Sequence, residues 1–305
     1  MNDLILANKY RILDKLHETK CSCVYSGINI FKNEEVIVKI ENNNISNILK
    51  HEADIYLYLM RQKQRVRIPK FKFFGVLKNF NYIILQKMNQ SLKDVFEKHT
   101  LILKDVCKIG IQIINLLERF HLQNLIHRDI KPENIVFDNK NNIYLIDFGL
   151  STTYKDVYQY RSRDTDSSIE FKSYLHSKGK NTFVGNIIFS SNQVHEGYDY
   201  YPKDDLISLS YLLIYLYFRE LPWSRLKIKE ESKNKTIELI KRNIDFIDYY
   251  KKNHQINNIN DFTLFQFFYY THNLTFDTSI DYSKLRNILY KELNHKSELL
   301  NFFSY

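Results

Sequence analysis

Two short runs of residues place the strongest constraint on this chain: HRDIKPEN at residues 127–134 and IDFG at residues 146–149. The first run brings together the carboxylate of Asp129 and the ammonium group of Lys131, and the second adds the carboxylate of Asp147. Chance is not expected to produce this octapeptide together with the second run at this spacing. We therefore interpret the two runs as parts of one reactive site rather than as structural segments.

Both runs resemble the catalytic loop and the metal-binding turn of protein kinases. The resemblance implies that Asp129 accepts the proton of an attacking hydroxyl group, and that Lys131 places a cation against the transferred phosphoryl group. Asn134 and Asp147 would bind Mg²⁺, a hard cation that prefers oxygen ligands and bridges the phosphates of a nucleotide. The sequence therefore predicts ATP and Mg²⁺ as cofactors.

A third segment, VIVK at residues 36–39, resembles the strand that carries the phosphate-binding lysine of protein kinases. A lysine in a strand is by itself most often a solvated side chain. Here the strand precedes a predicted helix that carries Glu52, which is the best ion-pair partner for Lys39, whereas Asp54 falls on a different face of that helix. The resemblance implies that adenine lies between Val24, Ile37 and the linker at residues 86–88. The other residues expected to bind the nucleotide are Leu16, Leu85, Gln86 and Met88.

Further segments resemble the casein kinase I family, and this likeness extends over about residues 9–290. The family consists of Ser/Thr protein kinases that use ATP and Mg²⁺ and often favour acidic or already phosphorylated substrates. The resemblance links Lys131 to Ser/Thr rather than Tyr specificity, and it implies that Asp205 holds the backbone of the catalytic loop. The segments that carry this likeness are residues 91–96, 189–192 with His195, 203–209, 220–223 and 281–286.

The chain departs from protein kinases in the loop that normally carries three glycines. Those positions correspond to His17, Thr19 and Ser22. Glycine lets the backbone approach phosphates closely and adopt positive φ. Its replacement is therefore expected to weaken the hold on ATP.

A second departure concerns substrate recognition. The Gly-Thr pair of the casein kinase I family reads Gly185-Asn186, and the basic residue of its phosphate-recognition site corresponds to Ile188, which cannot pair with an anion. Lys227 remains a candidate contact for a phosphorylated substrate.

Two alternatives follow from these departures. The first is a pseudokinase or scaffold module that kept the fold and lost efficient use of ATP. It is supported by the loop without glycines and opposed by the intact catalytic residues. The second alternative is a small-molecule kinase on the same fold, which the helical second half argues against.

Hydrophobic periodicity predicts an α+β protein with a small β-rich N-terminal lobe containing one helix, and a larger, mainly helical C-terminal lobe. We expect a two-lobed protein-kinase domain over residues 1–305, with lobes at about 1–86 and 91–305 and a hinge at about 86–90. The predicted strands are residues 10–16, 24–29, 35–40, 70–75 and 80–87. The predicted helices are residues 47–60, 105–121, 206–218, 233–252 and 262–273.

Composition limits the location and the partners of the chain. Three cysteines cannot form a disulfide framework, and the N-terminus lacks the features of a signal peptide, so we expect an intracellular protein, cytoplasmic or nuclear. The apolar run at residues 206–218 is too short to span a membrane. The net charge of +9 reflects a general excess of lysine, and the basic segment at residues 227–235 has no aromatic residue for stacking on bases. We expect a monomer that binds protein substrates and no nucleic acid.

Overall fold

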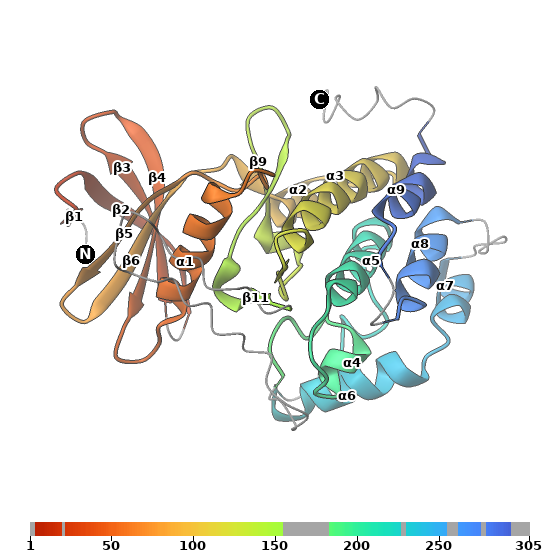
Figure 1. Cartoon of the computed structure of the whole chain (residues 1–305). Helices are drawn as coiled ribbons and strands as arrows, with labels where there is room; N and C mark the ends of the chain where they lie inside the picture. Colours follow the sequence, from red (N-terminus) through yellow and green to blue (C-terminus); the bar gives the residue numbers. More distant parts are fainter. Residues whose placement is uncertain are drawn as a thin grey trace.

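The computed structural model describes residues 4–19, 22–154, 183–226, 230–254, 262–275 and 279–293. Within them the chain forms an antiparallel sheet with one helix, followed by a larger helical part (Figure 1). The α+β class and the two lobes predicted from the sequence are therefore observed. Cys21, Lys227 and Lys229, which the sequence analysis considered, lie outside the described residues.

The first lobe is a six-stranded sheet in the order β1-β2-β3-β4-β6-β5, with every neighbouring pair antiparallel. Short polar turns join most of these strands, which explains the antiparallel order. The long connection from β4 to β5 contains the helix α1. The bounds are β1 Ile5–Leu6, β2 Tyr10–Glu18, β3 Ser22–Asn29, β4 Glu34–Asn42, α1 Ile48–Arg61, β5 Phe71–Leu77 and β6 Phe80–Gln86.

Alternation along β4 divides the side chains between the two faces of this sheet. Val36, Val38 and Ile40 are buried on one face, in a cluster with residues of the other strands. Ile37 and Lys39 lie on the opposite face, where Ile37 packs against the main core. This pleat directs the ammonium group of Lys39 to the side of the sheet that α1 covers.

The start of α1 depends on a carboxylate from β4. Asn47 precedes the helix but makes no side-chain cap. Instead, the buried Glu41 accepts hydrogen bonds from the backbone N–H groups of Ile48 and Leu49, at 3.0 and 2.5 Å. These donors have no partner inside the helix, and a negative charge there also complements the helix dipole. One strand therefore supplies Lys39 and, two residues later, positions the helix that carries its partner.

The second lobe packs around α3 and α5. The helix α5 is apolar on nearly all sides and is buried in the main core, as the sequence predicted. The helices are α2 Leu92–Lys98, α3 Leu103–His121, α4 Asn192–His195, α5 Pro202–Phe218, α6 Glu230–Asn243, α7 Phe246–His254, α8 Thr263–His272 and α9 Tyr282–Tyr290. The short strands are β7 Gln90–Ser91, β8 Leu125–Ile126, β9 Ile135–Phe137, β10 Ile143–Leu145 and β11 Thr152–Thr153, with 3-10 turns η1 Pro132–Asn134 and η2 Phe148–Leu150.

One predicted helix is wrong. Residues 233–252 were expected to form a single helix, but the structure has α6 and α7 with a break between them. Asp245 lies at this break, and its Oδ1 accepts a hydrogen bond of 2.9 Å from the N–H of Asp248. A side chain that accepts from the first turn starts a new helix, and this competes with continuation of the old one.

No helix in the described part of the chain is both long and apolar enough to cross a membrane.

The contact between Glu41 and α1 can be tested by Glu41→Gln, which removes the charge and leaves one oxygen acceptor. We expect the free energy of unfolding to fall by about 1–2 kcal/mol, measured by denaturant titration. Glu35→Gln on the same strand is the control, because that side chain is 66% exposed and pairs with Lys87 at the surface. The control should stay within about 0.5 kcal/mol of the parent. Equal effects of the two substitutions would contradict the capping role.

Candidate active site

Side chains of the run at residues 127–134 converge on the carboxylate of Asp129. Lys131 Nζ donates to its Oδ2 at 2.6 Å, and Asn134 Nδ2 donates to the same oxygen at 2.8 Å. A further bond of 2.9 Å from Asn134 Nδ2 reaches the backbone carbonyl of Asp129. Oδ1 of Asp129 has no hydrogen bond from the described residues and remains available as an acceptor.

The backbone of this loop is held by Asp205, at the start of α5. Its two carboxylate oxygens accept from the N–H groups of His127 and Arg128, at 2.7 and 2.9 Å, as the sequence predicted. His121 Nε2 lies 3.0 Å from Oδ2. Burial by itself raises the pKa of Asp205, but these hydrogen bonds and the nearby histidines hold that pKa below its ordinary value. The loop is therefore tied to the core of the second lobe by an ionised carboxylate.

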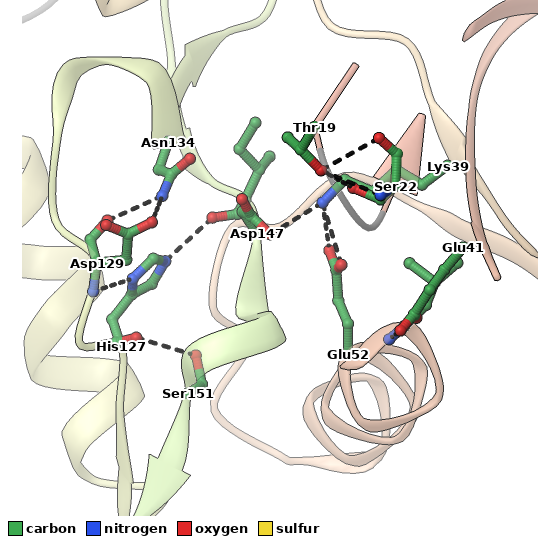
Figure 2. A network of polar contacts seen from close by, with 12 residues as sticks. Thr19, Ser22, Lys39, Glu41, Glu52, His127, Asp129, Asn134, Asp147 and Ser151 are labelled. Atoms are coloured by element: carbon green, nitrogen blue, oxygen red, sulfur yellow. Dashed lines mark hydrogen bonds and ion pairs between the residues drawn. The ribbon is translucent and has the colours of Figure 1, made fainter. Parts of the chain in front are cut away.

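His127 joins the two runs directly. Its Nδ1 accepts from the N–H of Asp129 at 3.3 Å, and its Nε2 donates to the carbonyl oxygen of Ile146 at 3.1 Å (Figure 2). The residue after Ile146 is Asp147, so this imidazole links the positions of the two carboxylates.

The ion pair predicted between Lys39 and Glu52 is present. Lys39 Nζ lies 2.9 and 3.1 Å from the two oxygens of Glu52, and 3.1 Å from Oδ1 of Asp147 (Figure 2). Burial lowers the pKa of Lys39, but the charges of Asp147 and Glu52 outweigh that effect and raise it overall. The same contact lowers the pKa of Asp147, so both groups are charged near neutral pH.

The exposure of the three side chains shows which of them faces outward. Glu52 is 2% exposed and Lys39 is 14% exposed, whereas Asp147 is 43% exposed. A cation and an accessible carboxylate thus lie side by side where β4, α1 and the turn after β10 meet.

Phe148 fixes the turn that follows Asp147. Its ring is fully buried, with Tyr56 of α1 at 4.9 Å, Phe120 at 5.5 Å and His127 at 5.5 Å between ring centroids. Gly149 follows, and a Cβ there would lie 2.6 Å from Cγ2 of Ile48 at the start of α1, so a larger residue would have to displace that side chain. The turn therefore packs directly against the helix that carries Glu52.

The apolar residues predicted to hold adenine lie on the Lys39 face of the sheet. Val24 pairs with Lys39 across β3 and β4, and Ile37 pairs with Leu85 across β4 and β6. Residues directly opposite each other in such a ladder share a face. Gln86 ends β6, Met88 follows it in the linker and is half-buried, and Leu16 on β2 is exposed.

The loop without glycines is closed by side chains instead. Oγ1 of Thr19 accepts from the N–H of Ser22 at 3.0 Å, and the two hydroxyl oxygens are 3.0 Å apart. The N–H of Thr19 also donates to the carbonyl of Ser22 at 2.8 Å. Residues 20 and 21 lie outside the described part. Hydroxyl groups here take part in holding the turn.

The donor set fits Mg²⁺ bound together with a nucleotide. Asn134 uses its Nδ2 toward Asp129, which leaves its Oδ1 as an oxygen ligand, and Asp147 presents an accessible carboxylate. The described residues contain no group of three or more His, Cys, Asp or Glu side chains that could hold a metal alone. Mg²⁺ commonly binds one or two protein oxygens together with phosphates and water. Asn134 and Asp147 would supply the two protein oxygens, and the nucleotide would supply the phosphates.

A sequence model of the protein kinase domain matches residues 10–297. The chain belongs to the protein kinase family. Members of this family bind ATP and Mg²⁺ and transfer a phosphoryl group to proteins. Activity in this family requires a Lys–Glu ion pair, which corresponds to Lys39–Glu52 here, and a metal held by the aspartate that corresponds to Asp147.

The kinase site also depends on Lys241 of α6, which the sequence analysis overlooked. Its Nζ donates to the carbonyls of Ile187 and Ser190, at 3.0 and 2.7 Å, and lies 5.0 Å from the ring centre of Trp223. Burial lowers the pKa of Lys241. In the sequence, the one signal that separates Lys241 from the many surface lysines is its position inside a predicted helix that packs on the core.

The segment held by Lys241 packs against the catalytic loop. Gly185 has φ of +121°, and a Cβ there would lie 2.7 Å from the carbonyl oxygen of Arg128. Tyr200 donates a hydrogen bond to the carbonyl of Val184. By donating to the carbonyls of Ile187 and Ser190, Lys241 therefore stabilises the segment that packs against the catalytic loop.

Lys241→Met should lower the free energy of unfolding by about 1–3 kcal/mol, because buried carbonyls lose their donor. We also expect the KM for a protein substrate to rise, while the KM for ATP stays near its parent value. Lys251→Met, at an exposed position of α7, is the matched control. Parent-like stability of Lys241→Met would show that the segment does not depend on this side chain.

Proposed function

We propose that this chain is an active Ser/Thr protein kinase of the casein kinase I type. The observation that carries the proposal is that Lys39 lies between Glu52 and Asp147. In the same site, Lys131 and Asn134 donate hydrogen bonds to the carboxylate of Asp129. Phosphoryl transfer needs this cation and accessible carboxylate together with the contacts that orient Asp129, whereas a scaffold protein needs only the contacts that hold its fold. The pseudokinase alternative rests on the glycine-free loop alone.

The proposed roles follow from the contacts of each side chain. Asp129 Oδ2 is taken by Lys131 and Asn134, so Oδ1 would orient the substrate hydroxyl group and accept its proton. Lys131 would then neutralise charge on the transferred group. Lys39 would hold the phosphates, and Asn134 and Asp147 would hold the metal. Bound Mg²⁺-ATP supplies the phosphoryl group.

Substrate class and type follow from the casein kinase I resemblance. Asp205 anchors the catalytic loop. Trp223 Nε1 donates to the carbonyl of Ile188 at 2.8 Å, so residues 220–223 lie against the chain at Ile188. Ile188 packs against the main core, so it offers no charge to a phosphate. We infer Ser/Thr substrates in acidic surroundings, with a weak preference for prior phosphorylation. We also propose that the protein acts inside the cell, as a monomer.

Asp129→Asn tests the catalytic assignment. The amide keeps the size of the side chain but cannot accept the proton, so kcat should fall about 100-fold or more. The assay is incorporation of labelled phosphate into casein with Mg²⁺-ATP. Asp248→Asn, at an exposed pair with Lys252, should keep parent activity. Undiminished activity of Asp129→Asn would contradict the proposal, and an inactive parent that also fails to bind Mg²⁺-ATP would support the pseudokinase alternative.

The contact between Thr19 and Ser22 gives a second test. Thr19→Val removes the hydroxyl group and keeps the shape of the side chain, so this contact is lost and the KM for ATP should rise about threefold to tenfold. Thr236→Val on α6 is the control, because Thr236 bonds only within its own helix, to the carbonyl of Ser232 at 3.0 Å. An unchanged KM for ATP would mean that the turn does not contribute to nucleotide binding.

A further inference from the structure

A row of basic side chains lies on the connection between α1 and β5. Residues 61–72 read RQKQRVRIPKFK, with six basic residues and no acidic residue. Lys72 pairs with Glu34 at 2.6 Å. We call the remaining exposed cations the basic ridge: Arg61, Lys63, Arg65, Arg67 and Lys70, joined by Arg119 at the end of α3.

Ion pairing does not neutralise the ridge, although Lys70 lies near Glu34 and, after Lys72, contributes to lowering the pKa of that carboxyl group. None of its six side chains forms an ion pair with a carboxylate in the part of the chain that the structure describes. Clustered like charges without counterions repel one another and raise the local positive potential, so they favour an anionic partner. Some surface lysines elsewhere differ in this respect: Lys15, Lys87 and Lys252 each pair with a nearby acid.

The ridge is also held in place. Val66 and Pro69 are buried, and Ile68 packs against the main core, while Arg65 and Arg67 face outward. A segment anchored by alternate residues presents its charges at fixed spacing.

Three backbone carbonyls of the segment accept hydrogen bonds from α3, β10 and β6. The carbonyl of Arg65 accepts from Arg119 Nη1 at 3.1 Å, that of Arg67 from Leu145 N at 3.2 Å, and that of Lys70 from Gln86 N at 2.9 Å. Binding a partner would therefore cost little ordering of the ridge backbone.

The chemistry of the ridge distinguishes between classes of polyanion. In an extended segment, residues two apart face the same side at a spacing of about 6.6 Å, which matches alternate side chains of an extended peptide. Single-stranded nucleic acids are usually bound with aromatic side chains that stack on bases. The aromatic residues beside the ridge, Tyr58 and Phe71, are partly buried against the core instead.

We propose that the basic ridge is a docking surface for acidic protein segments, rich in Asp, Glu or phosphorylated side chains, outside the catalytic cleft. Its use in substrate selection rests on the kinase function proposed above, whereas the binding itself does not. Gln86 begins the linker between the lobes, so one end of the ridge lies next to that linker. An acidic region of a substrate would bind there while another region reaches Asp129.

The test measures binding of fluorescein-labelled poly-glutamate to the full chain by anisotropy, at two salt concentrations. The ridge variant is Lys63→Glu/Arg65→Glu/Arg67→Glu, and the control is Lys78→Glu/Lys98→Glu/Lys251→Glu, which changes the net charge equally at scattered exposed positions. We expect the ridge variant to lose at least about tenfold in affinity and the control about threefold or less, with parent binding weakened by salt. Circular dichroism and thermal unfolding establish that both variants are folded.

Two further measurements, of DNA binding and of substrate kinetics, complete the test. A DNA duplex replaces poly-glutamate in the first, and preferential loss of duplex binding in the ridge variant would overturn the proposal in favour of a nucleic-acid surface. Equal losses in the ridge and control variants, or no poly-glutamate binding by the parent, would overturn it as well. In the second arm, the ridge variant should raise the KM for casein and leave that for a short neutral peptide unchanged. Because poly-glutamate binding needs no turnover, failure of the kinase proposal would leave the binding result readable.

Discussion

The structure depends most on one buried cation shared by two carboxylates. Lys39 comes from the sheet, Glu52 from α1 and Asp147 from the turn after β10, so a single ammonium group joins three elements far apart in the sequence. Desolvation makes a buried charge costly when it is alone, and this applies most to Glu52, which is 2% exposed. Lys39 supplies the partner of that carboxylate, so the contact ties the position of α1 to the sheet and to the Asp147 turn.

Several contacts outside the ion pair maintain this arrangement. Glu41 starts α1 from the strand that carries Lys39, and Gly149 allows the Asp147 turn to approach Ile48 without a clash. In the second lobe, Asp205 holds the catalytic loop by its backbone N–H groups. In each lobe, a carboxylate thus accepts from backbone donors next to the site. The catalytic carboxylate of Asp129 can then keep one oxygen available.

Patterns within short windows predicted much of the fold. Short β-branched and aromatic segments between polar turns identified the strands of the sheet. A period of 3.6 identified α1 and α3, and a run that is apolar on nearly all sides identified α5. The break between α6 and α7 was missed, since a capping bond from Asp245 leaves no change in apolar spacing. Lys241 was missed for a related reason. A lysine enclosed by carbonyls and aromatic rings from other segments has the same local sequence signal as an exposed one.

By itself, the sequence determined the reactive groups and the order of the elements. The runs around Asp129 and Asp147 specify which carboxylates and cations are present, and short-range periodicity specifies helices and strands. Tertiary structure decided which groups meet: that Glu41 caps α1, that the side chains of Thr19 and Ser22 contact each other, and that the ridge cations face outward with no ion pair to the described residues. The physical reason is that hydrogen bonds, ion pairs and burial depend on distances between segments. Those distances exist only once the chain has folded.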